Sequence, residues 1–283
     1  MKKIKQEKGS IAVYVSVVLL SMLFILFAVF LTSSSKIKAQ VETTLAVKQS
    51  YEADNAKAGD IYNSLVKDST PEYVSTGLML HYDAINNTGS GHSSSTTTWK
   101  DLSGNGNDGT ITGGSWSDNS LNFTTSNSSN GVKTSKNFPI DFENTFNIVF
   151  DLTTVSTVEP LFGSRTTSSN GFMLFNYNSN NALCLDTKGS STRLNLGSRL
   201  SANTKYDITV TFTGTTAKLY VNGKLSSTKT FTDASLNMPL TVFNAGSQSN
   251  ARGNIYSVKV YNRALTEAEI QQNYNIDKEK YGL

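Results

Sequence analysis

The chain has 283 residues, of which 37% are hydrophobic, 10% aromatic and 17% charged, with a formal net charge of +3. This composition is too polar for a multi-span membrane protein and too aromatic for a fully disordered one, and two His and one Cys argue against a Cys–His metal cluster or an internal disulfide framework. The excess charge lies in residues 1–70, because residues 71–283 hold 16 basic and 16 acidic residues. The larger part therefore lacks the basic surface of a nucleic-acid binder, and no nucleic-acid partner is expected.

The first 32 residues predict a membrane anchor. Residues 1–10 form a basic leader with four lysines and one glutamate, and residues 11–31 follow without a charge. A helix of that length is about 31 Å long, which matches a hydrocarbon core of about 30 Å. We therefore expect a single transmembrane helix over residues 11–32, with a cytoplasmic N-terminus and an extracellular C-terminal domain by the positive-inside rule. A cleaved secretory signal ending near residues 32–35 is the alternative.

Residues 33–72 predict an amphipathic helical stalk and linker. Ile37, Val41 and Leu45 are four residues apart, which places them on one face of a helix. Lys, Glu, Gln and Ala are common here, and proline is absent until Pro71. We therefore expect one long N-terminal helix that is apolar first and amphipathic later, and that ends just before Pro71.

This N-terminal part resembles the first helix of type IV pilins. The resemblance lies in the Lys-rich leader that ends at Lys8-Gly9, in the following Ser10, and in the long helix. It implies cleavage by a prepilin peptidase between Gly9 and Ser10, and the pilus machinery as a partner. The family's glutamate, which supports filament assembly, is replaced here by Tyr14. A plain signal-anchor helix explains the same residues.

From Val74 onward the hydrophobic period changes to two. Residues 146–152 and 208–212 alternate apolar and polar side chains, which is typical of half-buried antiparallel strands. Asn222-Gly223 between two such runs predicts a hairpin with a type I′ turn. Further strands are expected over residues 78–83, 171–177, 182–186, 240–244 and 255–261. Many short strands indicate a mainly β fold, a sandwich or a barrel, and Thr266 with Glu269 predicts a capped C-terminal helix.

Residues 73–283 resemble the concanavalin A-like, laminin-G-like jelly roll of bacterial surface proteins. Three segments carry the resemblance: Gly77–Ala84 (GLMLHYDA), Trp99–Thr110 (WKDLSGNGNDGT) and Gly253–Thr266 (GNIYSVKVYNRALT). It implies a two-sheet antiparallel sandwich with a short C-terminal helix. This fold carries lectins, adhesion modules, enzymes and spacers, so the resemblance specifies the fold better than the function.

The sequence offers no convincing catalytic group. Retaining glucanases need paired carboxylates on one strand face, and the nearest approach is Asp141 with Glu143, which precede a strand in a turn. Neither His81 nor His92 accompanies a nucleophile motif, and Cys184 lies in an apolar run typical of a buried residue. We therefore expect a protein that is not an enzyme, with a secreted glycan hydrolase as the less favoured alternative.

Two kinds of binding site are candidates. Calcium binds carboxylate and amide oxygens. We expect that the protein requires no cofactor, but a structural calcium site is a candidate. Its ligands would be Asp83, Asp101, Asn105 and Asp108. The family's Asp-Glu pair, which can help to hold the metal, is replaced by Tyr256 and Ser257. For a glycan, Trp116 and Arg165 are the candidate contacts, whereas Trp99 is expected in the core. The favoured function is a membrane-anchored, surface-displayed recognition module for a glycan or a surface protein, and the alternative is a minor pilin-like filament subunit.

Overall fold

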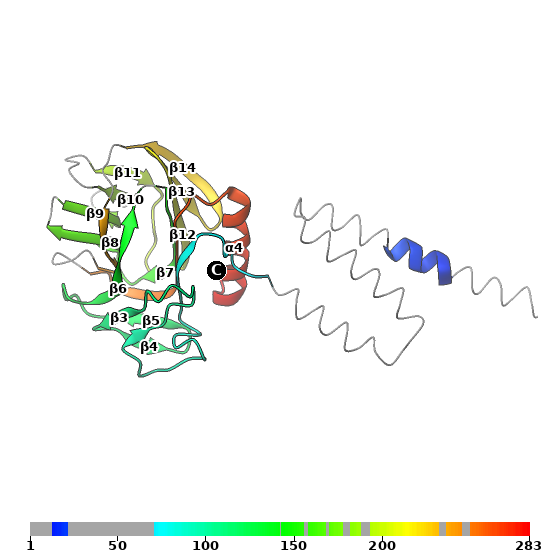
Figure 1. The fold of residues 1–283 in the computed structure, drawn as a ribbon, viewed down its shortest axis with the longest axis horizontal. Helices are drawn as coiled ribbons and strands as arrows, with labels where there is room; N and C mark the ends of the chain where they lie inside the picture. The colour runs from blue at the N-terminus through cyan, green and yellow to red at the C-terminus, as the bar shows by residue number, and fades with distance from the viewer. Residues whose placement is uncertain are drawn as a thin grey trace, which may run out of the picture. The chain divides into compact units, whose positions relative to one another are not determined.

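The structure is a computed structural model that describes residues 13–21, 71–141, 143–155, 158–167, 170–177, 182–187, 193–231, 236–244 and 250–283. The chain divides into two compact units, Met1–Pro71 and Glu72–Leu283. In the first unit, residues 13–21 form an α-helix (Figure 1). Within the described ranges, no helix is long and apolar enough to cross a membrane. Most of the predicted span, the predicted stalk, and Gly9 with Ser10 lie outside the described residues.

The second unit is a sandwich of two eight-stranded antiparallel sheets, as the sequence predicts (Figure 1). Sheet A has the spatial order β14 (Lys224–Thr230), β13 (Thr216–Val221), β12 (Tyr206–Thr213), β7 (Thr145–Leu152), β16 (Gly253–Tyr261), β5 (Ser120–Phe123) and β4 (Ser115–Ser117), and β1 (Leu78–Asp83) also pairs with β16. Sheet B has the order β11 (Leu194–Gly197), β10 (Ala182–Asp186), β9 (Asn170–Tyr177), β8 (Glu159–Thr167), β15 (Leu236–Val242), β6 (Gly131–Ile140), β3 (Gly109–Thr112) and β2 (Thr98–Trp99).

The hydrophobic core lies between the two sheets. Alternate residues of the strands point inward, and Phe146, Phe162, Phe172 and Phe212 meet there with ring centroids 5.0 to 6.1 Å apart. Trp99 is also buried in this core, as expected. The predicted hairpin joins β13 to β14, and Asn222 and Gly223 both have the positive φ angles, 50° and 74°, of a type I′ turn.

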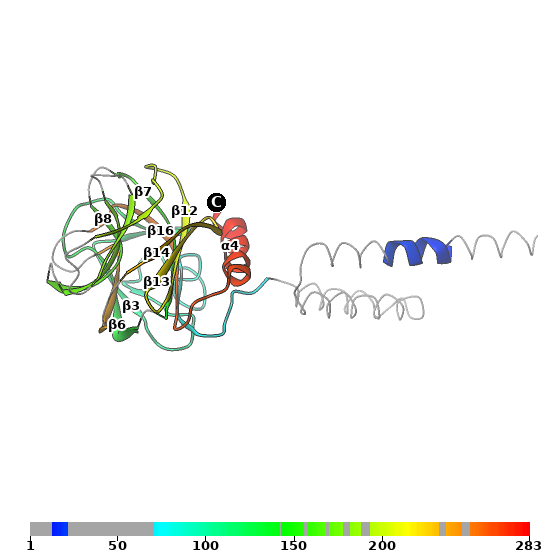
Figure 2. The same ribbon diagram turned by 90° about the horizontal axis from the view of Figure 1, so that it is seen from above.

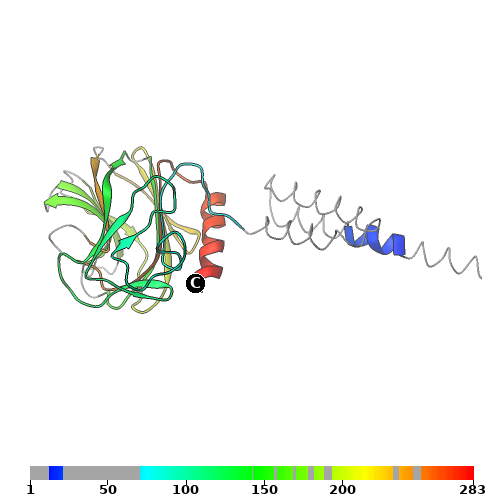
Figure 3. The ribbon, with the colours of Figure 1, turned by 60° about the horizontal axis from the view of Figure 1, so that its bottom comes forward.

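The C-terminal helix α4 (Glu267–Tyr281) is longer than the sequence analysis indicates. Thr266 and Glu269 form the predicted capping box, and Gly282 ends the helix in the left-handed conformation. The helix packs against the outer face of sheet A (Figures 2 and 3). Its inward residues are Ile270, Asn273, Asp277 and Tyr281, so half of this buried face is polar.

The helix changes the environment of the central strands of sheet A. All eight residues of β7 are buried, because one face of the strand points into the core and the other lies under α4. The prediction of half-buried strands is therefore wrong for β7, and also for β12 and β16, which are buried along almost their whole length. Under the helix, the cross-strand register places His81, Lys259, Asn147 and Thr209 in one row.

Candidate functional site

The Asp-x-Ser-Gly-Asn-Gly loop that follows β2 is organised around the carboxylate of Asp101. One oxygen accepts hydrogen bonds from the backbone N–H groups of His81 (3.0 Å) and Ser103 (2.9 Å). The other accepts from the backbone N–H of Asn107 (2.9 Å), and Asp101 is buried. A carboxylate that accepts three N–H bonds fixes the path of a tight loop without any metal.

The other predicted calcium ligands have similar partners. Asp108 accepts from the backbone N–H of Asp101 (2.9 Å) and from Lys100 Nζ (3.0 Å), and the amide of Asn105 donates to the carbonyl oxygen of Leu78. Asp83 lies apart from this loop and binds Lys280 and Tyr281 of α4. Among the described residues, no group of three or more His, Cys, Asp or Glu side chains is arranged to hold a metal ion. Calcium binding stays a prediction, and the carboxylate oxygens of Asp83, Asp101 and Asp108 already accept hydrogen bonds.

The two predicted glycan contacts have different outcomes. Trp116 in β4 is partly buried, packs edge-on against Trp99 with centroids 5.0 Å apart, and donates from Nε1 to the carbonyl oxygen of Thr96. The Ser- and Thr-rich sequence around Arg165 favours an exposed loop, but Arg165 belongs to strand β8, where it pairs with Gly171, so this loop prediction is wrong. Serine and asparagine are typical of loops, but threonine also favours sheets, which is consistent with the strand. Ligand binding by either residue stays a prediction.

Three residues weighed as catalytic groups lie in ordinary surroundings. Asp141 and Glu143 are exposed, and they bond with backbone groups of the turns around them. Cys184 is buried on the outer side of sheet B beside Met173 and Phe175, and burial raises the pKa of its thiol to about 11. A thiol with a raised pKa is a poor nucleophile at neutral pH.

Sheet B carries an aromatic–arginine cluster on its outer face, made of Phe175, Tyr177, Asp186 and Arg193. The guanidinium of Arg193 lies 3.9 Å from the ring centroid of Tyr177 and 4.8 Å from that of Phe175. It also forms a two-pronged pair with Asp186, with Nε–Oδ1 at 3.1 Å and Nη2–Oδ2 at 3.3 Å. Burial lowers the pKa of Arg193, but the pair with Asp186 outweighs this and raises it. The side chain of Arg193 is 36% exposed, so the cluster reaches solvent.

A row of polar side chains lies on the same face of sheet B, on the other side of strand β8. We call Thr98, Thr110, Lys133 and Thr241 the threonine row, because direct cross-strand pairing joins them from β2 through β15. From Thr241 the pairing continues through Gly163 and Met173 to Asp186. The outer face of sheet B therefore joins a polar, open strip to an aromatic and charged corner. No sequence motif marks this arrangement, because its members come from six strands and the segment before β11.

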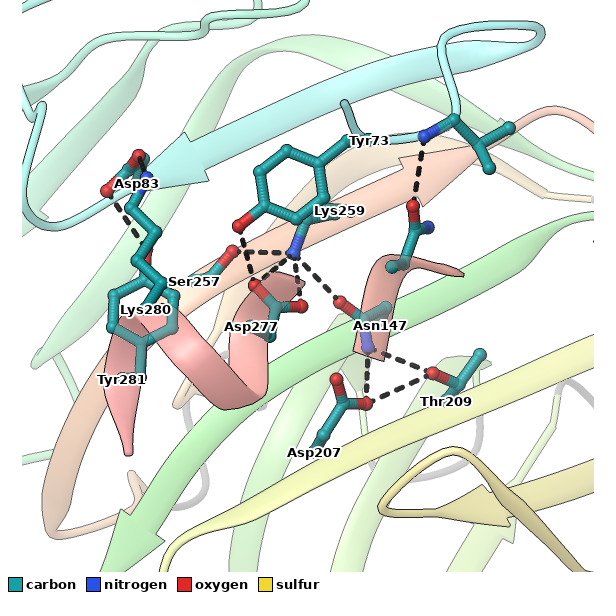
Figure 4. A network of polar contacts seen from close by, with 12 residues as sticks. Tyr73, Asp83, Asn147, Asp207, Thr209, Ser257, Lys259, Asp277, Lys280 and Tyr281 are labelled. Atoms are coloured by element: carbon teal, nitrogen blue, oxygen red, sulfur yellow. Dashed lines mark hydrogen bonds and ion pairs between the residues drawn. The ribbon is translucent and has the colours of Figure 1, made fainter. Parts of the chain in front are cut away.

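The outer face of sheet A contains a second polar group, which is closed to solvent (Figure 4). Lys259 and Asp277 form a fully buried ion pair at 2.7 Å, and the ammonium lies 4.2 Å from the ring centroid of Tyr73. Burial raises the pKa of Asp207 to about 8, and the nearby Asp277 adds to this. Burial, with Lys259 close by, lowers the pKa of His81 to about 3. Sequence reasoning missed this group, since a lysine at an outward strand position indicates solvent exposure unless a helix covers it.

A family model for the concanavalin A-like lectin/glucanases superfamily, Laminin_G_3, matches residues 125–271. The chain belongs to this superfamily. The match confirms the jelly-roll fold that the sequence motifs indicate. It extends from the loop before β6 to the first turn of α4, and it includes the aromatic–arginine cluster together with Asn147, Asp207 and Lys259. No curated protein matches the chain.

Solved structures share the fold of this superfamily member at low sequence identity. Domain 4 of AbnA, a GH43 extracellular arabinanase from Geobacillus stearothermophilus in complex with arabinotriose, is 15% identical with a TM-score of 0.56 and covers 70% of this chain and 98% of that one. Trypanosoma rangeli sialidase in complex with sialic acid is 15% identical with a TM-score of 0.56, over 84% of this chain and 39% of the sialidase. The binding domain of Paraclostridial Mosquitocidal Protein 1 is 18% identical with a TM-score of 0.52, over 70% of this chain and 52% of that one.

Proposed function

We propose that the protein is a membrane-anchored, surface-displayed recognition module that binds a glycan, without catalysis, on the outer face of sheet B. The observation that carries this proposal is the partly exposed Arg193, which contacts the ring of Tyr177 and the carboxylate of Asp186 on the same face of sheet B as the threonine row. Supporting it, two structural neighbours are described in complex with arabinotriose and with sialic acid.

The cluster has the chemistry that sugar recognition requires. A sugar ring presents hydroxyl groups on its edge and C–H groups on its faces. Arg193 and Asp186 offer planar donors and acceptors that can hydrogen-bond to adjacent hydroxyl groups, and Tyr177 offers an apolar surface beside them. The threonine row adds further hydroxyl groups along the same face.

The anchor part of the proposal rests on the uncharged stretch over residues 11–31. The part of it that the structure describes, residues 13–21, is helical. In this proposal the leader stays in the cytoplasm and the sandwich faces the outside. Fractionation of cells that express the full chain tests it, and the chain should pellet with membranes and resist extraction by high salt. Recovery in the soluble fraction would contradict the anchor.

Processing at Gly9 separates a plain anchor from a pilin-like subunit, which is the alternative in this proposal. The full chain and a Gly9→Leu variant should have the same leader and the same apparent mass if the helix is an uncleaved anchor. Loss of the leader from the unsubstituted chain alone, in cells that contain a prepilin peptidase, would favour the filament subunit.

A glycan array with the full chain tests recognition. Arabinotriose and sialic acid belong on the array, with a broad set of bacterial and host glycans. We expect at least one glycan to bind the unsubstituted chain, and the signal to fall in an Arg193→Ala variant. Lys218→Ala is the matched control, because it removes an exposed cation of sheet A. A silent array would contradict glycan recognition and would favour a protein partner.

A further inference from the structure

Three side chains in the buried group under α4 have complementary chemistry. Lys259 of β16 and Asn147 of β7 are direct cross-strand partners, and Lys259 Nζ lies 3.4 Å from Asn147 Oδ1 (Figure 4). On the other side of the same amide, Asn147 Nδ2 lies 2.7 Å from Asp207 Oδ1. All three residues are at most 2% exposed. An amine, an amide and a carboxyl group thus meet in a site closed to bulk water.

We infer that this is a self-modification site, at which Lys259 and Asn147 join in an intramolecular isopeptide bond with release of ammonia. The burial of these groups is otherwise hard to explain. A buried ion pair is weak evidence for stability, since apolar residues of similar volume often stabilise a fold as well or better. Strands β7 and β16 are buried along almost their whole length, so apolar residues would fit in place of both Asn147 and Lys259.

Proximity favours the reaction. The two side chains are held on adjacent strands, so no diffusion and little chain ordering are needed before attack. Lysine is a good nucleophile once it has lost its proton and its water shell, and Lys259 is fully buried. Asp277 is nearer to Lys259 Nζ, at 2.7 Å, but a carboxylate anion resists attack by an amine. Asp277 is therefore the base and Asn147 the electrophile.

The step balances with the residues present. The ammonium of Lys259 gives one proton to Asp277, and the resulting amine attacks Cγ of Asn147 to form the new C–N bond. Asp207 donates a proton to Nδ2, the Cγ–Nδ2 bond breaks, and ammonia leaves. The attacking nitrogen then returns its second proton to Asp207. The proton on Asp277 leaves with the ammonia as ammonium, and both carboxyl groups recover their starting states.

The surroundings of Asp207 fit the acid role. Asp207 Oδ2 is buried and has no hydrogen-bond partner among the residues that the structure describes, as expected for a carboxyl group that is not solvated as an anion. Its raised pKa, about 8, leaves it protonated at neutral pH. Thr209 Oγ1 lies 3.3 Å from its other oxygen and holds the carboxyl beside the amide. The ring of Tyr73 covers Lys259 from outside.

Such a bond would join strands across a long segment of chain. Residues 147 and 259 are 112 positions apart, and the bond would lock the two central strands of sheet A. The chain has one cysteine and so cannot form an internal disulfide bond. A covalent tie of this kind would suit a domain that is pulled between an anchor and a ligand.

Mass spectrometry of a tryptic digest of the purified full chain tests the inference. We expect one linked pair of peptides, residues 137–165 joined to residues 253–263, lighter than the sum of the two peptides by one ammonia molecule. Asp207→Asn is the informative variant, since it keeps the size of the side chain and removes the acid. It should fold, with near-ultraviolet circular dichroism like that of the unsubstituted chain, and should lack the linked pair.

Other results would overturn the inference. Only unlinked peptides from the folded, unsubstituted chain would mean that Lys259 and Asp277 form an ion pair alone. A link that loses water and joins Lys259 to Asp277 would show that the bond forms at Asp277 and not at the amide of Asn147. A linked pair that persists at full yield in Asp207→Asn would remove the acid from the mechanism. Asn147→Asp should also lack the linked pair, because it puts a carboxylate in place of the amide, and a linked pair in this variant would contradict the choice of electrophile.

Discussion

Replacement of Asp101 by alanine should strongly destabilise the second unit. In the folded protein this carboxylate accepts three backbone N–H bonds, at 2.9 to 3.0 Å, one from His81 of β1 and two from its own loop. The bonds from His81 and Asn107 are buried, and the bond from Ser103 is partly buried. Removing the side chain leaves all three donors without this acceptor.

The expected magnitude follows from the cost of orphaned donors. A buried N–H that loses its partner costs about 1–3 kcal/mol, and two of the three are buried. The free energy of unfolding should therefore fall by about 3–5 kcal/mol in Asp101→Ala, which is about 10 °C in melting temperature for a domain of this size. Asp101→Asn keeps one acceptor oxygen and should cost about 1–3 kcal/mol.

Urea unfolding followed by tryptophan fluorescence measures this, with and without calcium or a chelator. Asp118→Ala is the matched control, because Asp118 is exposed in a turn and its removal should change stability by no more than about 0.5 kcal/mol. We expect the unfolding midpoints of all variants to be independent of calcium. A small loss in Asp101→Ala, or a loss seen only in the presence of calcium, would refute the hydrogen-bonding account and favour a metal site in this loop.

Three further predictions test other parts of the structure. Between about pH 4 and pH 8 folded Asp207 keeps a proton that the unfolded chain releases, so its contribution to stability should fall as pH rises through this range. Burial of neutral His81 acts in the opposite direction up to about pH 6.5, and the Asp207→Asn variant removes only the first effect. Relative to Asp207→Asn, the unsubstituted chain should therefore lose stability to urea between about pH 5 and pH 8, and equal slopes would argue against a neutral Asp207. Gly223→Ala should lower the melting temperature measured by calorimetry more than Gly104→Ala does. Both glycines have positive φ, but only at Gly223 would an added Cβ meet another side chain, 2.7 Å from Tyr274 Cδ1. Equal decreases in melting temperature would exclude that clash. Arg193→Ala should lower stability by less than about 1 kcal/mol, because its ion pair with Asp186 is partly exposed, and a larger loss would make the cluster structural.

Much of the second unit could be predicted from local patterns. The strands β7 and β12, the Asn222-Gly223 turn and the Thr266 capping box each follow from nearest-neighbour chemistry, and the structure confirms all of them. The burial of the outer side of β7 could not be predicted, because it depends on where α4 docks. A helix whose inward face includes Asn273 and Asp277 gives little hydrophobic signal.

The candidate calcium ligands and glycan contacts could likewise be predicted only where they are close in sequence. Asp101, Asn105 and Asp108 are close in sequence, and the loop brings Asp101 into contact with Asp108, whereas the amide of Asn105 bonds to the backbone of β1. Asp83 was expected nearby, but it instead contacts Lys280 and Tyr281, about two hundred residues away. The contact between Arg193 and Tyr177 depends on the order of β9, β10 and β11 in sheet B, which no local pattern encodes.

The affinity of the full chain for its best array glycan, with Tyr177→Ala and Lys218→Ala beside it, tests glycan recognition on the outer face of sheet B most directly. Titration calorimetry should give tight binding for the unsubstituted chain and for Lys218→Ala. For Tyr177→Ala it should give affinity at least about tenfold weaker, a loss of about 1.4 kcal/mol. Equal affinity in all three proteins would place the glycan elsewhere and contradict the account.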